Sequence, residues 1–351
     1  MKILITGGMG FIGSAVIRRL MRTTGASVVN VDCLTYAASP EAIEEAGADP
    51  RHRHVNADIS DTTAIREVFA AHDPDAVMHL AAESHVDRSI DGPAAFVQTN
   101  VTGTLSLLEA ALAHWRAMPA ERAARFRFHH VSTDEVFGHL EPGDAPFTAA
   151  TPYAPRSPYA ASKAASDHLV RAFHATYGFP AFVTNTCNNY GPWQFPEKLI
   201  PLTIANALEG KPLPVYGRGE NVRDWIHVDD HAAGLVAALW RAKPGETHLL
   251  GAHAERRNID VVRTICAVLD RVAPDAAGPR ERLITYVTDR PGHDFRYAID
   301  AKPAMDALGW KPVHSFESGL EATIRWYVEH AEWWQAIRAR RYAGQRLGTA
   351  A

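Results

Sequence analysis

Lys2-Ile3-Leu4-Ile5-Thr6-Gly7-Gly8-Met9-Gly10-Phe11-Ile12-Gly13 is the stretch that decides the fold of this chain. Its first five residues are mostly apolar and partly β-branched, which predicts a buried parallel strand. Glycines follow at 7, 10 and 13, and residues 14–20 continue with helical spacing. A strand, a glycine turn and a helix N-terminus form a cradle for phosphate, because backbone N–H groups face the anion and no Cβ blocks its approach. Taken alone, the stretch also fits a glycine-rich turn that binds nothing.

An acidic residue at the end of the next strand favours the nucleotide interpretation. Residues 27–31 form a second apolar run, and Asp32 follows it directly. A carboxylate at this point accepts hydrogen bonds from the adenosine ribose hydroxyls. Because it would also repel a 2′-phosphate, we expect NAD as the cofactor and not NADP.

Composition and charge exclude several classes of protein. The chain has 351 residues, 46% hydrophobic and 22% charged, with a formal net charge of −4. These are ordinary globular values, and without a basic run we expect no nucleic-acid partner. No apolar stretch is long enough to span a membrane and no signal peptide precedes the first strand, so we expect a cytoplasmic protein without membrane contact. The three cysteines lack metal-ligand spacing, so we expect reduced thiols and no metal site.

Strands and helices alternate through the first half of the chain. Residues 75–82 and 125–132 read as strands, and residues 96–115 as one amphipathic helix with Val97, Val101, Leu105, Leu108 and Leu112 on one side. This alternation predicts an α/β protein with a doubly wound parallel sheet of Rossmann type. Pro- and Gly-rich connections become frequent after residue 190, which suits a smaller mixed α/β substrate domain. We therefore predict a cofactor domain over residues 1–190 that carries the catalytic residues. We predict a substrate domain over 191–335, with some chain crossing back, and a frayed tail over 336–351.

Tyr159 and Lys163 are candidates for hydride-transfer chemistry. Ser157-Pro158 precedes them as a helix start, and the four-residue spacing puts both on one helix face. A phenol ordinarily titrates near pH 10. We expect the ammonium of Lys163 and the positive nicotinamide to lower the pKa of Tyr159.

Thr133-Asp134-Glu135 follows the strand over 125–132, at the edge of the sheet where ligands bind. Adjacent acids could remove and donate the protons of an elimination of water. In an extended strand, however, the two side chains would point to opposite faces. Only an irregular turn could aim both at one substrate.

Four stretches together resemble a known family: Gly7–Gly13, Leu80–Ser89, Ser132–Gly138 and Ser157–Lys163. They are similar to the extended short-chain dehydrogenase/reductase superfamily and, within it, to the dTDP-glucose 4,6-dehydratase family. Second-half stretches agree, namely Asn188–Pro192, Phe195–Pro201, Arg223–Trp225 and Asp289–Asp294, so the resemblance covers residues 1 to about 330. Phe137, the Tyr36-Ala37-Ala38-Ser39 loop and Thr186-Cys187 depart from the family pattern.

The resemblance implies a lyase that dehydrates dTDP-glucose to the 4-keto-6-deoxy sugar with tightly bound NAD, which is regenerated in each cycle. It implies that Tyr159 removes the O4 proton, assisted by Lys163 and Thr133, that Glu135 takes the C5 proton, and that Asp134 protonates the departing C6 hydroxyl. A homodimer is implied as well; the helices over 96–115 and 160–177 are candidates for its interface, although core packing explains them equally well.

The cofactor contacts predicted from the glycine turn and from the resemblance are Gly7, Gly10, Phe11, Ile12, Gly13, Asp32, Thr35, Asp58, Ile59, Leu80, Ala82, Ser84, Thr99, Tyr159, Lys163 and Asn189. The nucleotide-sugar contacts implied by the resemblance are Ser84, Thr133, Asn188, Lys198, Leu199, Pro214, Tyr216, Arg223, Asn258, Arg290 and His293. Arg223, Arg290 and Lys198 suit a pyrophosphate.

Other functions stay open at this stage. A nucleotide-sugar 4-epimerase would oxidise C4 without needing the acid pair, a dehydratase could act on another nucleotide sugar, and an NAD-binding sensor would need no catalysis. The sequence identifies neither the base nor the downstream pathway.

Overall fold

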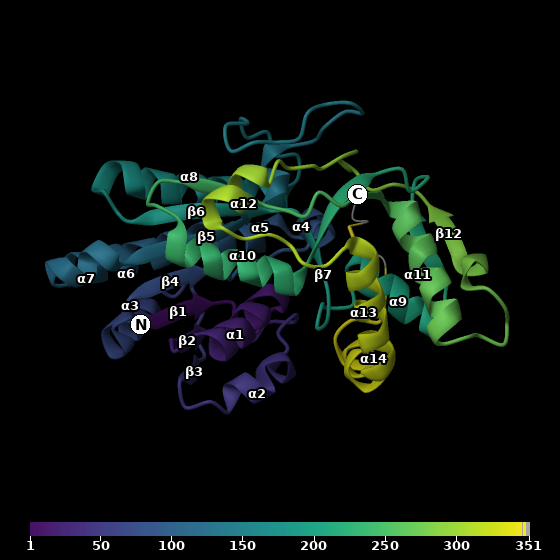
Figure 1. The fold of residues 1–351 in the computed structure, drawn as a ribbon, viewed down its shortest axis with the longest axis horizontal. Coiled ribbons are helices and arrows are strands. Elements are labelled where there is room, and N and C mark those ends of the chain that lie inside the picture. The colour runs from purple at the N-terminus through teal and green to yellow at the C-terminus, as the bar shows by residue number, and fades with distance from the viewer. Residues whose placement is uncertain (346, 349–351) are drawn as a thin grey trace.

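A seven-stranded parallel sheet forms the centre of the protein in the computed structural model, which describes residues 1–345 and 347–348 (Figure 1). Its strand order is β10-β6-β5-β4-β1-β2-β3, and every pairing is parallel. The strands are β1 Lys2–Thr6, β2 Ser27–Val31, β3 His52–Val55, β4 Ala76–His79, β5 Arg127–Thr133, β6 Ala181–Thr186 and β10 Thr247–Leu250. The predicted doubly wound parallel sheet is confirmed.

Helices cover both faces of this sheet, which explains why its strands are apolar on both sides. In β1, Ile3 and Ile5 join one buried cluster, and Leu4 joins the cluster on the opposite face. The first cluster is closed by α1 Phe11–Thr23, α10 Val228–Arg241 and α12 Lys302–Leu308. The second is closed by α3 Thr62–His72, α6 Thr104–Ala117 and α8 Pro158–Tyr177. Shorter helices in this half are η1 Pro40–Ile43, α2 Glu44–Gly47, α4 Val86–Asp91, α5 Pro93–Phe96, α7 Ala120–Arg125 and η3 Asp134–Phe137.

The helix predicted over residues 96–115 is interrupted by a π-helix, η2 Val97–Gly103, between α5 and α6. A π-turn takes more residues than an α-turn, so it rotates the apolar stripe. Val97 is 53% and Leu105 36% exposed, while Leu108 and Leu112 are buried. The prediction of one regular helix over 96–115 is therefore wrong. Leu105, Leu108 and Leu112 keep regular spacing within α6, whereas Val97 and Val101 lie in the π-helix, where the assumed constant helical period does not hold.

The second half builds a smaller unit beside the carboxyl edge of the sheet, on the right of Figure 1. Its strands are β7 Asn188–Tyr190, β9 Val222–His227 and β11 Glu255–Arg257 in one sheet, and β8 Leu213–Tyr216 with β12 Ile284–Val287 in another. Its helices are α9 Leu199–Leu208, α11 Asn258–Val272, η4 Arg280–Leu283, α13 Phe316–Glu329 and α14 Ala331–Arg340. Since β10, α10 and α12 return to the main sheet, the chain crosses between the halves, and a boundary at residue 190 stays a prediction.

The predicted frayed tail over 336–351 is wrong for its first part. Helix α14 continues to Arg340, and Ile337, Arg338 and Tyr342 are buried. Ile337 and Tyr342 pack with Phe195, and Arg338 donates a 2.8 Å hydrogen bond to Asn206. This apolar packing orders a segment whose Arg- and Ala-rich composition suggested fraying. Residues 346 and 349–351 of that prediction lie outside the described residues.

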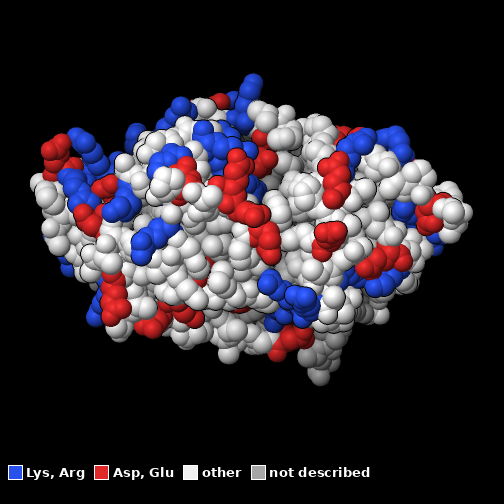
Figure 2. Space-filling view, turned by 90° about the horizontal axis from the view of Figure 1, so that it is seen from below, with Lys and Arg blue, Asp and Glu red and all other residues white. Residues whose placement is uncertain are grey.

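Acidic and basic side chains are intermixed over the face drawn in Figure 2.

Within residues 1–345 and 347–348, no helix combines the length and apolar character needed to cross a bilayer.

Candidate active site

The glycine turn between β1 and α1 brings backbone close to backbone. Gly7 has φ +74°, and a Cβ there would lie 2.6 Å from the Ala81 nitrogen. A Cβ on Gly13 would lie 2.1 Å from the Gly7 oxygen. Only glycine fits either position, so helix α1 begins with its N–H groups open to the space beyond the strand ends.

Asp32 is held in place by backbone N–H groups of two neighbouring loops. Its Oδ2 accepts a 2.9 Å hydrogen bond from the Met9 nitrogen, and its Oδ1 accepts one of 2.8 Å from Leu34. The carboxylate therefore has a fixed position at the end of β2, beside the glycine turn, as the ribose interpretation requires.

A cavity of about 400 Å³ extends from this turn along the carboxyl ends of the strands. Every residue predicted to contact the cofactor lines it: Gly7, Gly10, Phe11, Ile12, Gly13, Asp32, Thr35, Asp58, Ile59, Leu80, Ala82, Ser84, Thr99, Tyr159, Lys163 and Asn189. The glycine cradle, the fixed carboxylate and the continuous lining fit a dinucleotide. The individual binding roles remain predictions.

Thr133, at the end of β5, starts the irregular turn on which the acid pair depends. Its hydroxyl accepts a 3.2 Å hydrogen bond from the Glu135 N–H, and residues 134–137 then form the 3₁₀ helix η3. The strand thus ends before the two acids, so they do not alternate between its faces. Glu135 lines the cavity together with Thr133, whereas Asp134 is only 2% exposed and lies behind the lining.

The pKa values of the two acids are raised to different degrees. Burial, reinforced by the charges of Glu135 and Asp224, raises the pKa of Asp134 well above its ordinary range. Burial also raises the pKa of Glu135, but the charges of Arg290, Lys198 and Arg223 oppose it. Of the two, Asp134 is therefore the group that retains its proton.

Tyr159 and Lys163 lie one turn apart on α8, which Ser157 caps by accepting a 3.1 Å hydrogen bond from Ala160. Both side chains line the cavity. Burial and the charge of Glu135 raise the pKa of Tyr159, while a hydrogen bond with Thr133 lowers it. The Lys163 ammonium donates a 2.9 Å hydrogen bond to the Val131 carbonyl and is not among the main causes of this pKa shift. That Lys163 and the bound nicotinamide lower the pKa of Tyr159 stays a prediction.

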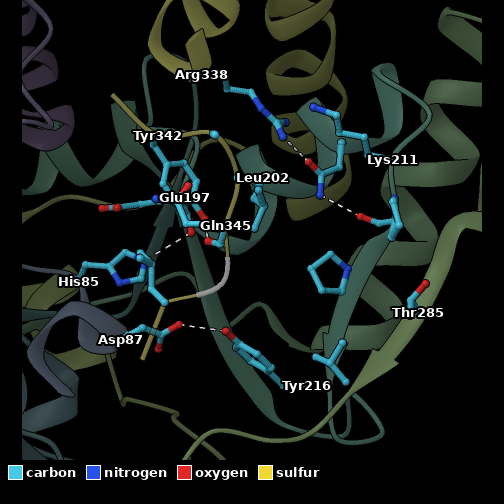
Figure 3. A pocket seen from close by; sticks show the side chains of 17 residues that line it. His85, Asp87, Glu197, Leu202, Lys211, Tyr216, Thr285, Arg338, Tyr342 and Gln345 are labelled. Atoms are coloured by element: carbon cyan, nitrogen blue, oxygen red, sulfur yellow. Dashed lines mark hydrogen bonds between the residues drawn. The ribbon is translucent and has the colours of Figure 1, made fainter. Parts of the chain in front are cut away.

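The predicted nucleotide-sugar contacts are divided between several places. Ser84, Thr133, Asn188, Lys198 and Leu199 line the same cavity as the cofactor set. Pro214 and Tyr216 line a second cavity of about 400 Å³, shown in Figure 3, where Tyr216 donates to Asp87 over 3.1 Å. Glu197 lines both cavities, so the two spaces adjoin.

Four predicted contacts line neither cavity: Arg223, Asn258, Arg290 and His293. Arg290 pairs with Asp87 at 2.6 Å, and His293 with Asp289 at 2.6 Å. The buried Arg223 donates to the Asp294 carbonyl at 2.9 Å and lies over the ring of Tyr297. The structure therefore engages Arg223, Arg290 and His293 with protein partners, and substrate binding by these four residues stays a prediction.

Glu197 is the functional residue that the sequence reasoning missed. Its side chain is 2% exposed; it accepts hydrogen bonds from Arg88 at 2.8 Å and from Tyr36 at 3.0 Å, and Arg88 lies over the Tyr36 ring. These three residues come from three separate segments, and Glu197, which Tyr36 and Arg88 hold from behind, lines the cofactor cavity. The available signal was the acid next to Lys198 in Phe195-Pro196-Glu197-Lys198.

Comparison with known proteins assigns the family. The family model for GDP-mannose 4,6 dehydratase matches residues 4–323. The chain belongs to the GDP-mannose 4,6 dehydratase family. Its similarity to members of this family extends over nearly the whole chain. A dTDP-glucose 4,6-dehydratase of Escherichia coli is 55% identical over 359 residues, which is 99% of both chains. One of Neisseria meningitidis serogroup B is 56% identical over 351 residues, again 99% of both.

A solved structure agrees with this dehydratase assignment. The chain is similar to DesIV, a dTDP-glucose 4,6-dehydratase of Streptomyces venezuelae solved with NAD and dTDP bound. The identity is 42% and the TM-score 0.87, covering 96% of this chain and all of the other. The chain and DesIV thus share the same fold.

Proposed function

We propose that this protein is an NAD-dependent lyase that converts dTDP-glucose to dTDP-4-keto-6-deoxyglucose. The observation that carries the proposal is the turn η3, which places Glu135 in the same cavity as Tyr159, with Asp134 directly behind it. Dehydrogenase groups and an acid pair at one site suit oxidation followed by elimination. The curated relatives named for this reaction support the choice of substrate.

Tyr159 takes the proton of the sugar O4 as C4 is oxidised. Lys163 contributes positive charge beside it, and the Thr133 hydroxyl stabilises the phenolate by a hydrogen bond. Bound NAD supplies the acceptor for the C4 hydride and the donor that returns hydride to C6. Since the same cofactor molecule serves both steps, it has to stay bound throughout the cycle.

The acid pair carries out the elimination. A ketone at C4 acidifies the C5 proton, which Glu135 removes because nearby Arg290, Lys198 and Arg223 favour its charged form. Asp134 keeps its proton through burial and gives it to the departing C6 hydroxyl. Two carboxyl groups with different pKa values thus divide the roles of base and acid.

A 4-epimerase is less well supported, because C4 oxidation and re-reduction give no role to Asp134 and Glu135. A dehydratase acting on another nucleotide sugar would use the same pyrophosphate contacts, so the base preference is open to direct comparison of substrates.

We also propose a homodimer that functions in the cytoplasm. Exposed Val97, Leu105 and Tyr177 lie on the η2–α6 segment and on α8, where a second copy could cover them. Cys33, Cys187 and Cys266 are all free thiols, as expected in a reducing compartment. Light scattering on the purified protein tests the dimer.

The decisive experiment incubates purified protein with dTDP-glucose and no added cofactor, and follows the base-developed absorbance of the 4-keto-6-deoxy product. Product is expected, and it establishes dehydration and retained NAD together. If the protein converted only UDP-, CDP- or GDP-sugars, the reaction type would stand and the proposed substrate would be replaced. C4 epimerisation without loss of water would overturn the proposal.

A further inference from the structure

A buried polar cluster lies behind Lys163, on the side away from the cavity. His130 on β5 and Asp167 on α8 are fully buried, and His130 Nε2 is 3.1 Å from Asp167 Oδ1. The same Nε2 lies 3.5 Å from Lys163 Nζ. Lys163 and Asp167 are also one helical turn apart, so they share the face of α8 that packs on the sheet.

The Asp167 carboxylate accepts hydrogen bonds from two further residues besides its contact with His130. The Tyr153 hydroxyl donates a 2.7 Å hydrogen bond to Oδ2, and the Asn185 amide on β6 donates one of 3.1 Å to the same atom. That amide also donates a 2.9 Å hydrogen bond to the Thr133 carbonyl, directly before the acid pair. Asp167 therefore connects the helix of Lys163 with the strand end that carries Thr133.

The cluster carries one negative and one positive charge. Burial raises the pKa of Asp167, but hydrogen bonding to His130 and Tyr153 and the charge of Lys163 oppose it, and the net shift is downward. Burial and the charge of Lys163 lower the pKa of His130 to about 4, although Asp167 opposes this. His130 is neutral near pH 7, and Asp167 is the counter-charge of Lys163.

Lys163 depends on this counter-charge because it is itself buried. Burial lowers the pKa of Lys163 to about 8, and the Asp167 carboxylate raises it. Arg171, the other cation near the cluster, donates to the Tyr153 hydroxyl at 2.8 Å and lies over its ring. Tyr159, Asp134 and Glu135 face the cavity end of the site. An isolated buried ammonium would lose its proton instead of remaining charged.

We propose that Asp167 is a positioning residue for the reaction: its buried carboxylate, which is linked to Lys163 through His130, keeps the Lys163 side chain charged where it lines the cavity with Tyr159. The proposal rests on the proposed dehydratase function, in which that charge assists proton removal from the sugar O4. Asp167 itself touches neither cavity.

The test is the pH profile of the rate of C4 oxidation, followed as reduced cofactor after mixing with dTDP-glucose, in the Asp167→Asn and Asp167→Glu enzymes. This step does not need Asp134, so its alkaline limb reports on the groups beside Tyr159. Asn keeps the acceptor for Tyr153 and Asn185 but removes the charge, so Lys163 loses its proton at lower pH. We expect the alkaline limb to move down by about one pH unit or more, which makes the oxidation rate about tenfold lower above that pH. Glu keeps the charge, so the limb of the Glu variant stays at the wild-type pH even if its maximal rate falls. KM should change little in either variant.

Asp230→Asn is the matched control, since Asp230 is also a buried aspartate paired with a histidine, His314 at 3.0 Å, and lines neither cavity. Its pH profile should match the wild type. A folded Asp167→Asn enzyme with an unmoved limb overturns the proposal, as does an Asp167→Glu limb that moves as far as that of Asn. If the Asn variant does not fold, Asp167→Gln carries the same test, because it also removes the charge and keeps an amide oxygen as acceptor.

A second readout needs no substrate. The ammonium resonance of Lys163, in protein with isotope-labelled lysine and assigned with Lys163→Met, should titrate near pH 8 in the wild type. It should titrate at least about one unit lower in Asp167→Asn. An unchanged midpoint overturns the proposal. If dTDP-glucose is not converted, the proposed function fails while this titration still decides the role of Asp167.

Discussion

The cofactor side and the sugar side of the site differ in how directly the sequence places their residues. Every predicted cofactor contact lines one cavity. The predicted nucleotide-sugar contacts are spread over that cavity, the adjoining one and a rim where Arg290 and His293 pair with protein carboxylates. The cofactor side is formed by ends of parallel strands, which one topological rule brings to one edge. The sugar side is formed by loops and short strands of the second half, whose meeting depends on tertiary contacts.

Tyr159→Phe should have the largest effect, because it removes the group that takes the O4 proton while leaving the ring packed. We expect kcat to fall by roughly 10²–10⁴ with NAD content and melting temperature unchanged. Stopped-flow absorbance of the reduced cofactor, with substrate in excess, measures the oxidation step. If this variant oxidised the substrate at the wild-type rate, Tyr159 would not be the group that takes the O4 proton.

Asp134→Asn should separate the two chemistries of the cofactor side. Oxidation at C4 needs no acid pair, so reduced cofactor should still form, while product falls by roughly 10²-fold for lack of a proton for the C6 hydroxyl. The test measures two quantities on one sample, namely the initial burst of reduced-cofactor absorbance and the yield of dehydrated product. Dehydrated product at the wild-type rate would show that Asp134 is not the acid of the elimination.

Asp134 also determines how the elimination rate and the stability of the wild-type protein depend on pH. Burial raises the pKa of Asp134, so its proton persists above the ordinary carboxyl range and is lost at higher pH, where elimination slows. The folded protein binds this proton more tightly than the unfolded chain, so stability falls as pH rises through that interval. Asp134→Asn should flatten this part of a plot of melting temperature against pH.

Local rules account for what the sequence predicted, and long-range packing accounts for what it did not. The strand over residues 2–6, the glycine turn and the helix start at Pro158 depend on neighbours in the chain, and all three are confirmed. The irregular turn at Asp134 was stated as a requirement and is present as η3. The π-helix over 97–103, the buried Tyr342 and the Glu197 contacts depend on partners far away in sequence, so composition and periodicity did not reveal them.

Arg290→Ala tests the sugar side of the comparison. If Arg290 leaves Asp87 to bind a pyrophosphate oxygen, KM for dTDP-glucose should rise about tenfold to a hundredfold with kcat nearly unchanged. Asp87→Asn, which frees Arg290 from its 2.6 Å ion pair, should raise KM much less. Arg257→Ala, an exposed pair with Asp260, is the control. An unchanged KM for Arg290→Ala would show that this rim does not bind the substrate.

The smallest expected effect concerns the wall that joins the two sides. Tyr36, from the loop after β2, and Arg88, from α4, both donate to Glu197 and so connect the first half of the chain to this lining residue of the cofactor cavity. Tyr36→Phe removes one hydrogen bond to a buried carboxylate and keeps the ring against Phe195 and Arg88. The wall should then open more often, because that bond contributes about 1 kcal/mol or more.

NAD should therefore leave the Tyr36→Phe protein about threefold to tenfold faster, with kcat at saturating NAD close to the wild type. The amount of NAD that remains with the protein after timed dialysis measures this directly, without turnover. Tyr286→Phe, on the exposed face of β12, should retain NAD as the wild type does. Glu197→Gln should lose NAD faster than Tyr36→Phe, because it weakens both contacts at once. Equal retention in all four proteins would show that the glycine turn and Asp32 hold the cofactor without this wall, and that the two sides of the site are energetically independent.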